Sequence, residues 1–281
     1  TSTTANTSSY TAGGKSVNLS SDRTYYASYQ TTVKATYNYY SGSAATSSSK
    51  TATAYMSYNG GMIGGTPTVP TIPTISGYTQ RGWSKSSAYN AATVTPGAIT
   101  ENVTYYMSYT TQITVTYNMN GGTGTVPAAV NGTCYMAYNG TKTGASITMS
   151  STTEVTKLHY DRVGWNSKAD GTGTNYTNGT SYTFNQSTTL YAKWTSKGNY
   201  VVDNTSYYKT LSEAVEGANS GSTIEVLATN TDSGAITIDK DITLNLSDYT
   251  VTKSSAITIS SGVTVNIEGN KNGTLQNTSL E

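Results

Sequence analysis

The chain repeats itself at a fixed spacing. Residues 55–60, Tyr-Met-Ser-Tyr-Asn-Gly, return at 135–140 as Tyr-Met-Ala-Tyr-Asn-Gly. Residues 35–38, Ala-Thr-Tyr-Asn, return at 115–118 as Val-Thr-Tyr-Asn, with the same offset, which we call the long spacing. Self-similarity at a fixed spacing indicates tandem copies of one small domain. Tandem domains usually act as spacers or multivalent binders, so this pattern argues against a single catalytic unit.

A closing motif sets the expected limits of each copy. It occurs as Thr-Tyr-Tyr-Ala-Ser-Tyr at 24–29, as Thr-Tyr-Tyr-Met-Ser-Tyr at 104–109 and as Thr-Leu-Tyr-Ala-Lys-Trp at 189–194. We therefore predict the C-terminal part of a truncated repeat at 1–30, repeat domains at 31–111 and 112–195, and a different region at 196–281. We also expect this sequence to be an excised piece of a larger protein.

The composition favours strands and a low-charge surface. Charged residues make up 11% of the chain, well below the quarter or so of an average globular protein. Tyr occurs 25 times and Phe once, and Val, Ile, Thr and Tyr all favour strands. We therefore predict a mainly β chain. A net charge of +1 gives no electrostatic reason to expect a nucleic-acid partner, and no run is long and apolar enough for a membrane span.

The third copy carries the motifs of a known repeat. It has Tyr-Asn-Met-Asn-Gly-Gly at 117–122, Tyr-Asp-Arg-Val-Gly-Trp-Asn at 160–166 and Thr-Thr-Leu-Tyr-Ala-Lys-Trp at 188–194. It resembles the Listeria–Bacteroides repeat, also called the internalin B-type repeat, over nearly all of 112–195. That resemblance implies a small β-grasp-like unit. Gln80 and Arg162 stand where many family members have Phe, and Tyr109 replaces the closing Trp of the second copy.

A shorter period begins after residue 200. We predict one helix at 207–218, because Leu211, Ala214, Val215 and Ala218 fall on one helical face. Ala-Ile-Thr-Ile then occurs at 235–238 and again at 256–259, and Ile242, Leu244 and Leu246 match Val263, Val265 and Ile267 with the same offset. This stretch resembles the opening coils of a right-handed parallel β-helix of the pectate-lyase-like type, with the helix as its cap.

The residues that usually carry catalysis are sparse. His159 is the only histidine and Cys134 the only cysteine, and the sequence has no Gly-x-Ser-x-Gly motif. We expect both to be structural. Asp239 and Asp241 could serve acid–base chemistry or calcium binding, with Asp203 and Asp232 as possible neighbours, but we favour turn positions for them. We predict no enzyme activity in this chain, no cofactor and no metal.

Tyrosines are the best candidates for a binding surface. Tyr39, Tyr40, Tyr55 and Tyr58 crowd the second copy. Exposed tyrosine rings bind sugars by stacking and are favoured at binding surfaces. The alternative is that the tyrosines replace Phe in the core or cover small sheets.

These patterns suggest a fragment of a bacterial cell-surface or secreted adhesin-like protein. Its repeats would act as a stalk or as weak multivalent binding modules. Host or cell-wall glycans or surface proteins are the expected partners, and we expect a monomer. One alternative is the accessory region of a polysaccharide-degrading β-helix enzyme, and another is a spacer without a ligand.

Overall fold

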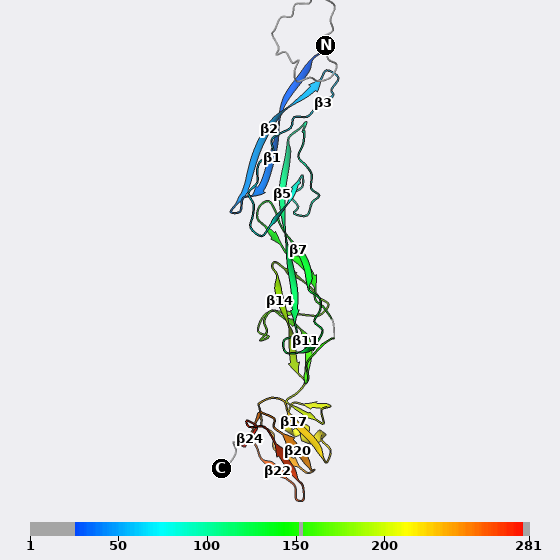
Figure 1. The fold of residues 1–281 in the computed structure, drawn as a ribbon, viewed down its shortest axis with the longest axis vertical. Helices are drawn as coiled ribbons and strands as arrows, with labels where there is room; N and C mark the ends of the chain where they lie inside the picture. Colours follow the sequence, from blue (N-terminus) through cyan, green and yellow to red (C-terminus); the bar gives the residue numbers. More distant parts are fainter. Residues whose placement is uncertain (1–25, 152–153, 278–281) are drawn as a thin grey trace, which may run out of the picture. The chain divides into compact units, whose positions relative to one another are not determined.

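The computed structural model describes residues 26–151 and 154–277 (Figure 1). These residues are mainly β, as the composition predicted, and include one short helix. The chain divides into two compact units. The first comprises the described residues up to Thr116 with Ala129–Thr148 and Ser181–Thr188. The second comprises Tyr117–Ala128, Met149–Thr180 and the described residues from Thr189 onward.

The first unit is organised around two long strands, β1 (Ser28–Tyr40) and β5 (Val103–Asn118). β1 pairs antiparallel with β2 (Ala45–Ser57) along its whole length, and residues 35–38 of β1 pair in parallel with the start of β5. Figure 1 shows β1 and β2 side by side. The remaining strands are β3 (Met62–Ile63), β4 (Thr79–Ser84), β7 (Val130–Met136), β8 (Lys142–Thr143), β9 (Ala145–Thr148) and β13 (Ser181–Phe184).

Alternating side chains of β1 build the core of this unit. Val33, Ala35 and Tyr37 point inward and are 3%, 0% and 0% exposed, because successive residues of a strand face opposite sides. The Tyr37 ring lies 5.0 Å from Trp83 in an edge-on arrangement and 5.3 Å from Tyr105 in a stacked one, measured between centroids. Such aromatic pairs add stability beyond their buried area.

The Gly-Trp pair of each copy marks a bulge in its strand. In β4 the register against β5 shifts between Gln80 and Gly82, and Gly82 has φ +131°. In β11 (Tyr160–Asn166) the register against β14 (Thr188–Ser196) shifts before Gly164, which has φ +142°. Residues with a Cβ rarely adopt this backbone conformation, which explains a glycine before each Trp.

In the second unit the tryptophans anchor the packing around β11 and β14. Trp165 is fully buried, and its indole N–H donates to the carbonyl of Ser150 at 3.1 Å. Trp194 donates to the carbonyls of Met119 and Asn120 at 3.2 and 3.0 Å. Trp165 is thus a core residue, whereas Trp194 is half-buried. The short strands nearby are β6 (Thr123–Gly124), β10 (Val155–Thr156) and β12 (Asn175–Tyr176).

Residues 200–277 form short strands stacked in parallel, which we call the coil region. Three parallel ladders join successive coils: β17–β20–β23, β18–β21–β24 and β19–β22. Ile236, Ile238, Leu244 and Val251 fill the interior. The elements are β15 (Tyr200–Val202), β16 (Ser206–Tyr208), α1 (Leu211–Gly217), β17 (Ser222–Val226), β18 (Asn230–Asp232), β19 (Ile236–Ile238), β20 (Ile242–Asn245), β21 (Thr250–Lys253), β22 (Ile257–Ile259), β23 (Val265–Glu268) and β24 (Thr274–Asn277).

The coil region corrects two predictions. The helix begins at Leu211 rather than at residue 207, because Thr210 caps it with Glu213 in a capping box while residues 206–208 pair with β15. The predicted offset holds for Ile236 and Ile257, but Ile242 pairs with Val265 rather than with Val263. The turn at 260–264 before β23 is longer than the turn at 239–241 before β20. The resulting shift is even, so the same side chains still face inward.

Two predicted domain limits fall inside strands. The limit at 30/31 lies within β1, and the limit at 111/112 lies within β5. In each case the predicted closing strand of one copy and the opening strand of the next form one continuous strand. Most of the truncated copy predicted at 1–30 lies outside the described residues. The domain division therefore stays a prediction.

Candidate functional site

The four tyrosines predicted to bind a ligand lie at two ends of the β1–β2 hairpin. Tyr39 and Tyr40 end β1, whereas Tyr55 pairs with Gln30 near its start and Tyr58 follows β2. The strand rises about 3.4 Å per residue, so the distance from Gln30 to Tyr39 is about 30 Å. The structure therefore arranges these tyrosines as two separate pairs.

Tyr58 belongs to an exposed cluster that we call the open surface: Tyr26, Tyr29, Met56 and Tyr58. The rings of Tyr26 and Tyr58 lie 4.4 Å apart between centroids. Tyr29 is 57% exposed and Tyr58 is 48% exposed, while Tyr26 and Met56 are close to two-fifths exposed. Tyr26 and Tyr58 thus form one exposed pair, and Tyr29 and Met56 form another across β1 and β2.

The same residue types recur at the long spacing in a cluster that we call the filled surface: Tyr106, Tyr109, Met136 and Tyr138. The rings of Tyr106 and Tyr138 lie 4.9 Å apart. Tyr109 faces Met136 across β5 and β7 in the same register in which Tyr29 faces Met56 across β1 and β2. Tyr109 and Met136 are only 0% and 1% exposed. The two clusters thus share their strand pairing and differ in burial.

Tyr39 and Tyr40 help to bury the filled surface. Both pack against the buried cluster that contains Tyr109 and Met136. The Tyr109 hydroxyl donates to the Tyr40 carbonyl at 3.0 Å. Burial raises the pKa of Tyr109 to about 12. Tyr39 and Tyr40 therefore have a packing role, and ligand binding by them stays a prediction.

Arg81 on β4 contacts Tyr135, the residue before Met136 of the filled surface. Its guanidinium donates to the carbonyls of Tyr89 and Ala91 at 2.8 and 3.2 Å. It also lies 5.6 Å from the centroid of the Tyr135 ring, within the range of a cation–π contact. Tyr55 is the counterpart of Tyr135 at the long spacing, and no cation of the described residues lies over its ring in this way.

A second candidate site is a cleft of about 370 Å³ in the second unit. Lys157 lies 4.4 Å from the Tyr160 ring centroid, and Arg162 lies 4.9 Å from that of Trp165 and donates to Asn178 at 3.1 Å. Burial lowers the pKa of the Arg162 guanidinium. Trp194 and Lys197 also line the cleft. The combination of cations and aromatic rings suits an anionic or sugar ligand.

Sequence reasoning missed this cleft because its residues are spread over several motifs. A signal was present in Arg162, which replaces the Phe of many family members. In the structure its guanidinium lies over the Trp165 ring, so it takes the place of an aromatic neighbour while adding a charge.

The aspartates considered as possible acid–base or calcium residues make separate contacts. Asp203 accepts hydrogen bonds from the Ser222 hydroxyl and the Thr223 N–H, and these bonds lower its pKa. Asp241 accepts from the Thr264 N–H at 2.7 Å. Among residues 26–151 and 154–277, no three His, Cys, Asp or Glu side chains are placed to hold a metal ion.

Asp232 forms a buried ion pair instead. Its carboxylate lies 3.0 Å from Lys253, and the two side chains are 4% and 0% exposed. It also accepts from the N–H of Leu211 at the start of α1. Lys253 donates in addition to the Gly234 carbonyl. These bonds tie the helix to two coils and satisfy both buried charges.

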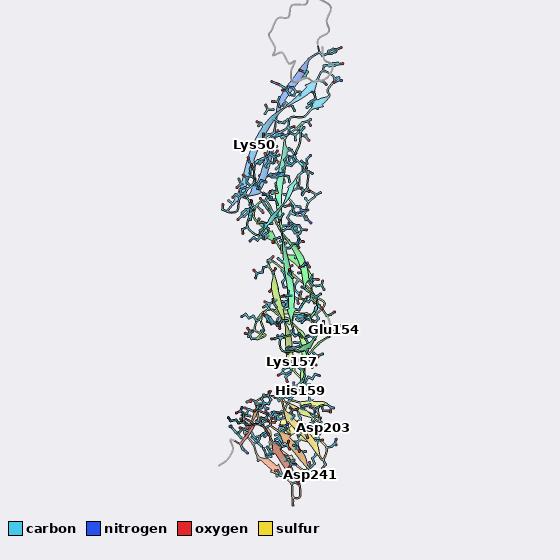
Figure 2. All side chains as sticks on the ribbon, in the orientation of Figure 1. Lys50, Glu154, Lys157, His159, Asp203 and Asp241 are labelled. Atoms are coloured by element: carbon cyan, nitrogen blue, oxygen red, sulfur yellow. The ribbon has the colours of Figure 1, made fainter. Side chains whose placement is uncertain are left out.

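His159 and Cys134 have structural surroundings. His159 lies in the turn between β10 and β11, and its carbonyl accepts from Lys197 N–H at 3.0 Å (Figure 2). Cys134 is 3% exposed, and its thiol donates to the Phe184 carbonyl at 3.3 Å. Both make packing or backbone contacts, and the structural roles expected for them from the sequence stay predictions.

Residues 114–193 match the family model of the Listeria–Bacteroides repeat domain. The match confirms the resemblance that the third copy showed. This repeat is typical of bacterial surface proteins and is commonly extracellular or surface-associated. Comparisons with curated proteins and with solved structures found no match. The β-helix resemblance has no family match and stays a prediction.

Within the described part of the chain, no helix has the length and apolar character needed to cross a membrane.

Proposed function

We propose that this chain is a segment of a bacterial cell-surface or secreted adhesin-like protein, with its repeats acting as a stalk and as weak multivalent binding modules. The observation that carries the proposal is the match of residues 114–193 to a repeat typical of bacterial surface proteins. We infer a β-grasp-like unit for each copy from the same resemblance. We propose that the chain acts as a monomer without catalytic activity or a cofactor.

Strand continuity supports the stalk. β1 runs through the predicted limit at 30/31 and β5 runs through the limit at 111/112, so no Gly- or Pro-rich linker separates adjacent copies. A paired strand is stiffer than a flexible linker of the same length. Repetition of such copies would carry a distal module outward, and weak binding by each copy would add through effective concentration.

The coil region fits the start of a parallel β-helix, which we propose as the second architecture. Ser222 pairs with Ile242, Asn230 with Val251 and Ile236 with Ile257, so successive coils are nearly equal in length on all three ladders. The buried ion pair between Asp232 and Lys253 ties α1 to these coils as a cap.

Glycans are the ligand class that the cleft favours. Lys157, Arg162 and Lys197 supply positive charge, with Lys197 paired to the Asp161 carboxylate at 3.8 Å, while Tyr160 and Trp194 supply ring faces and edges. Sugars stack on aromatic rings, and acidic sugars add contacts to lysine and arginine. An anionic glycan of the host surface or of the cell wall would therefore bind better than a neutral one.

Two other functions would leave the repeats without this role. In a polysaccharide-degrading β-helix enzyme the repeats would be accessory carbohydrate binders. In a ligand-free spacer no glycan, matrix protein or cell extract would bind above background.

The test is an array of neutral and acidic glycans probed with the intact chain and with the variant K157Q. We expect binding to acidic glycans and about tenfold weaker binding by the variant, equal to about 1.4 kcal/mol. The control is K50Q, which removes one exposed lysine from β2, outside the cleft (Figure 2). Equal binding by wild type and K157Q, or no binding at all, would contradict the proposal.

A further inference from the structure

The second and third copies build the Gly-Trp strand and its neighbour on the same backbone plan. Gln80 faces Tyr109 across β4 and β5, and Arg162 faces Trp194 across β11 and β14. In both copies the register shifts directly after this position, at the bulge. Because the two registers agree, each residue of one strand pair has a definite counterpart in the other.

The turn before the Gly-Trp strand is shared as well. The Tyr78 N–H donates to the Ile75 carbonyl, and the Tyr160 N–H donates to the Lys157 carbonyl, both at 3.1 Å. Ile75 is therefore the counterpart of Lys157. Their side chains differ in what they contact, because Ile75 packs against a buried cluster of the first unit, whereas Lys157 lines the cleft of the second unit.

The charged residues that line the cleft all have uncharged counterparts in the second copy. The pairs are Lys157 and Ile75, Asp161 and Thr79, Arg162 and Gln80, and Lys197 and Gln112. The Gln80 side chain donates instead to the Pro73 carbonyl at 3.4 Å, and the Gln112 side chain donates to the Thr133 hydroxyl at 2.9 Å. The two copies thus share a backbone, while the charge belongs to the third copy alone.

The cations of the cleft keep a net positive charge that a ligand can meet. Lys157 and Arg162 each lie over an aromatic ring, at 4.4 and 4.9 Å from its centroid. A ring face positions a cation without neutralising it. Lys197 differs, since the Asp161 carboxylate lies 3.8 Å from it. Three cations and one carboxylate leave the lining at +2, and a cleft lined mainly by one sign of charge concentrates ions of the other sign.

We propose that the two copies have divided their roles: the third copy binds an acidic glycan in its cleft, and the second copy is a spacer built on the same backbone. Lys157, Arg162 and Lys197 determine which copy binds. This inference rests on the proposed glycan binding and refines it. The multivalency of the stalk then depends on how many copies carry the charged set, rather than on how many copies there are.

The experiment titrates the intact, isotope-labelled chain with a hexamer of galacturonic acid, and with a galactose hexamer as the uncharged control. Shifts of the backbone amide signals in NMR spectra report where the sugar binds, even when binding is weak. We expect saturable shifts at residues 155–162 and 194–197 with the acidic hexamer, and none at residues 73–80 and 109–112.

Two double variants test which residues decide the outcome. R162Q/K197Q gives the third copy the glutamines of the second copy, and it should weaken binding by at least about tenfold because two of the three cations are lost. Q80A/Q112A is the matched control, which changes the counterpart positions of the second copy and should leave binding unchanged.

Saturable shifts of equal size in both copies, or equal losses of binding in the two double variants, would overturn the division of roles while glycan binding itself stands. Equal binding of the galactose hexamer would also overturn it, because charge would then decide nothing. No binding of the acidic hexamer at millimolar concentration would overturn the proposed function and this inference together.

A single variant keeps the test decisive if R162Q/K197Q loses its native amide spectrum. K197Q changes a side chain that is 37% exposed, so the fold should persist. It removes one cation and leaves the Asp161 carboxylate without that partner, so binding should weaken by about threefold. Unchanged binding by K197Q would overturn the proposal.

Discussion

The open surface and the filled surface carry nearly the same residues in the same strand register, yet they meet different surroundings. Tyr29 is 57% exposed and Tyr109 is fully buried, and Met56 and Met136 are 37% and 1% exposed. The local pairing of each Tyr with its Met is identical. The repeated motif thus determines the hairpin, while burial depends on the Gly-Trp strand and on Tyr40 from elsewhere in the chain.

The tyrosine pair provides the largest expected contrast. Tyr109→Ala should lower the free energy of unfolding by about 3–5 kcal/mol, because it empties a buried aromatic site. Tyr29→Ala should change it by less than about 0.5 kcal/mol, because the ring is largely in water. Urea denaturation of both variants measures this contrast, and equal losses would show that the two surfaces are buried alike.

The methionine pair repeats the contrast with a smaller side chain. Met136→Ala should cost about 2–4 kcal/mol through the cavity that it leaves in the cluster with Tyr109 and Trp83. Met56→Ala should again stay within about 0.5 kcal/mol. Melting temperatures from calorimetry give the comparison, and a Met56→Ala loss as large as that of Met136→Ala would contradict it.

Alkaline pH should weaken the filled surface. Burial raises the folded-state pKa of Tyr109 from 10.0 to about 12, so the neutral phenol is favoured in the folded chain. Its contribution to stability is complete below pH 10 and is lost as the pH rises toward 12. Tyr109→Phe should flatten the fall in unfolding free energy over this window. A fall of the same steepness in the variant would assign the effect to other groups.

A second repeated pair tests a single hydroxyl. Tyr37 and Tyr117 are counterparts at the long spacing, and the Ser150 N–H donates to the Tyr117 hydroxyl at 3.4 Å. The buried Tyr37 hydroxyl has no hydrogen-bond partner in the described part of the chain. Tyr117→Phe should therefore cost about 0.5–1.5 kcal/mol, whereas Tyr37→Phe should be neutral or slightly stabilising. Denaturant midpoints of the two variants decide this, and a loss for Tyr37→Phe would reveal a partner for its hydroxyl.

Much of the fold follows from the sequence because strand patterns are local. The closing motifs at 104–109 and 189–194 lie in β5 and β14, as the strand-favouring composition led us to expect. The fusion of closing and opening strands was missed, although the absence of Gly and Pro between residues 103 and 118 was a usable signal. The pairing of Ile242 with Val265 was missed because turn length decides it, and an even shift in register leaves the inward pattern intact.

The candidate site was harder to predict because its arrangement depends on distant contacts. Tyr39, Tyr40, Tyr55 and Tyr58 are close in sequence, but a long hairpin places them at opposite ends. The exposure of Tyr29 and the burial of Tyr109 depend on contacts with distant segments, and no local pattern distinguishes the two residues.

Hydrogen–deuterium exchange of the unmodified chain tests the central claim most directly, by comparing residues 26–30 with residues 106–110 in one sample. β4 covers the edge at 106–110, whereas the equivalent edge at 26–30 has no strand against it among the described residues. The account predicts that residues 106–110 exchange at least about a hundredfold more slowly, since their opening requires β4 to leave. Equal protection of the two segments would contradict it.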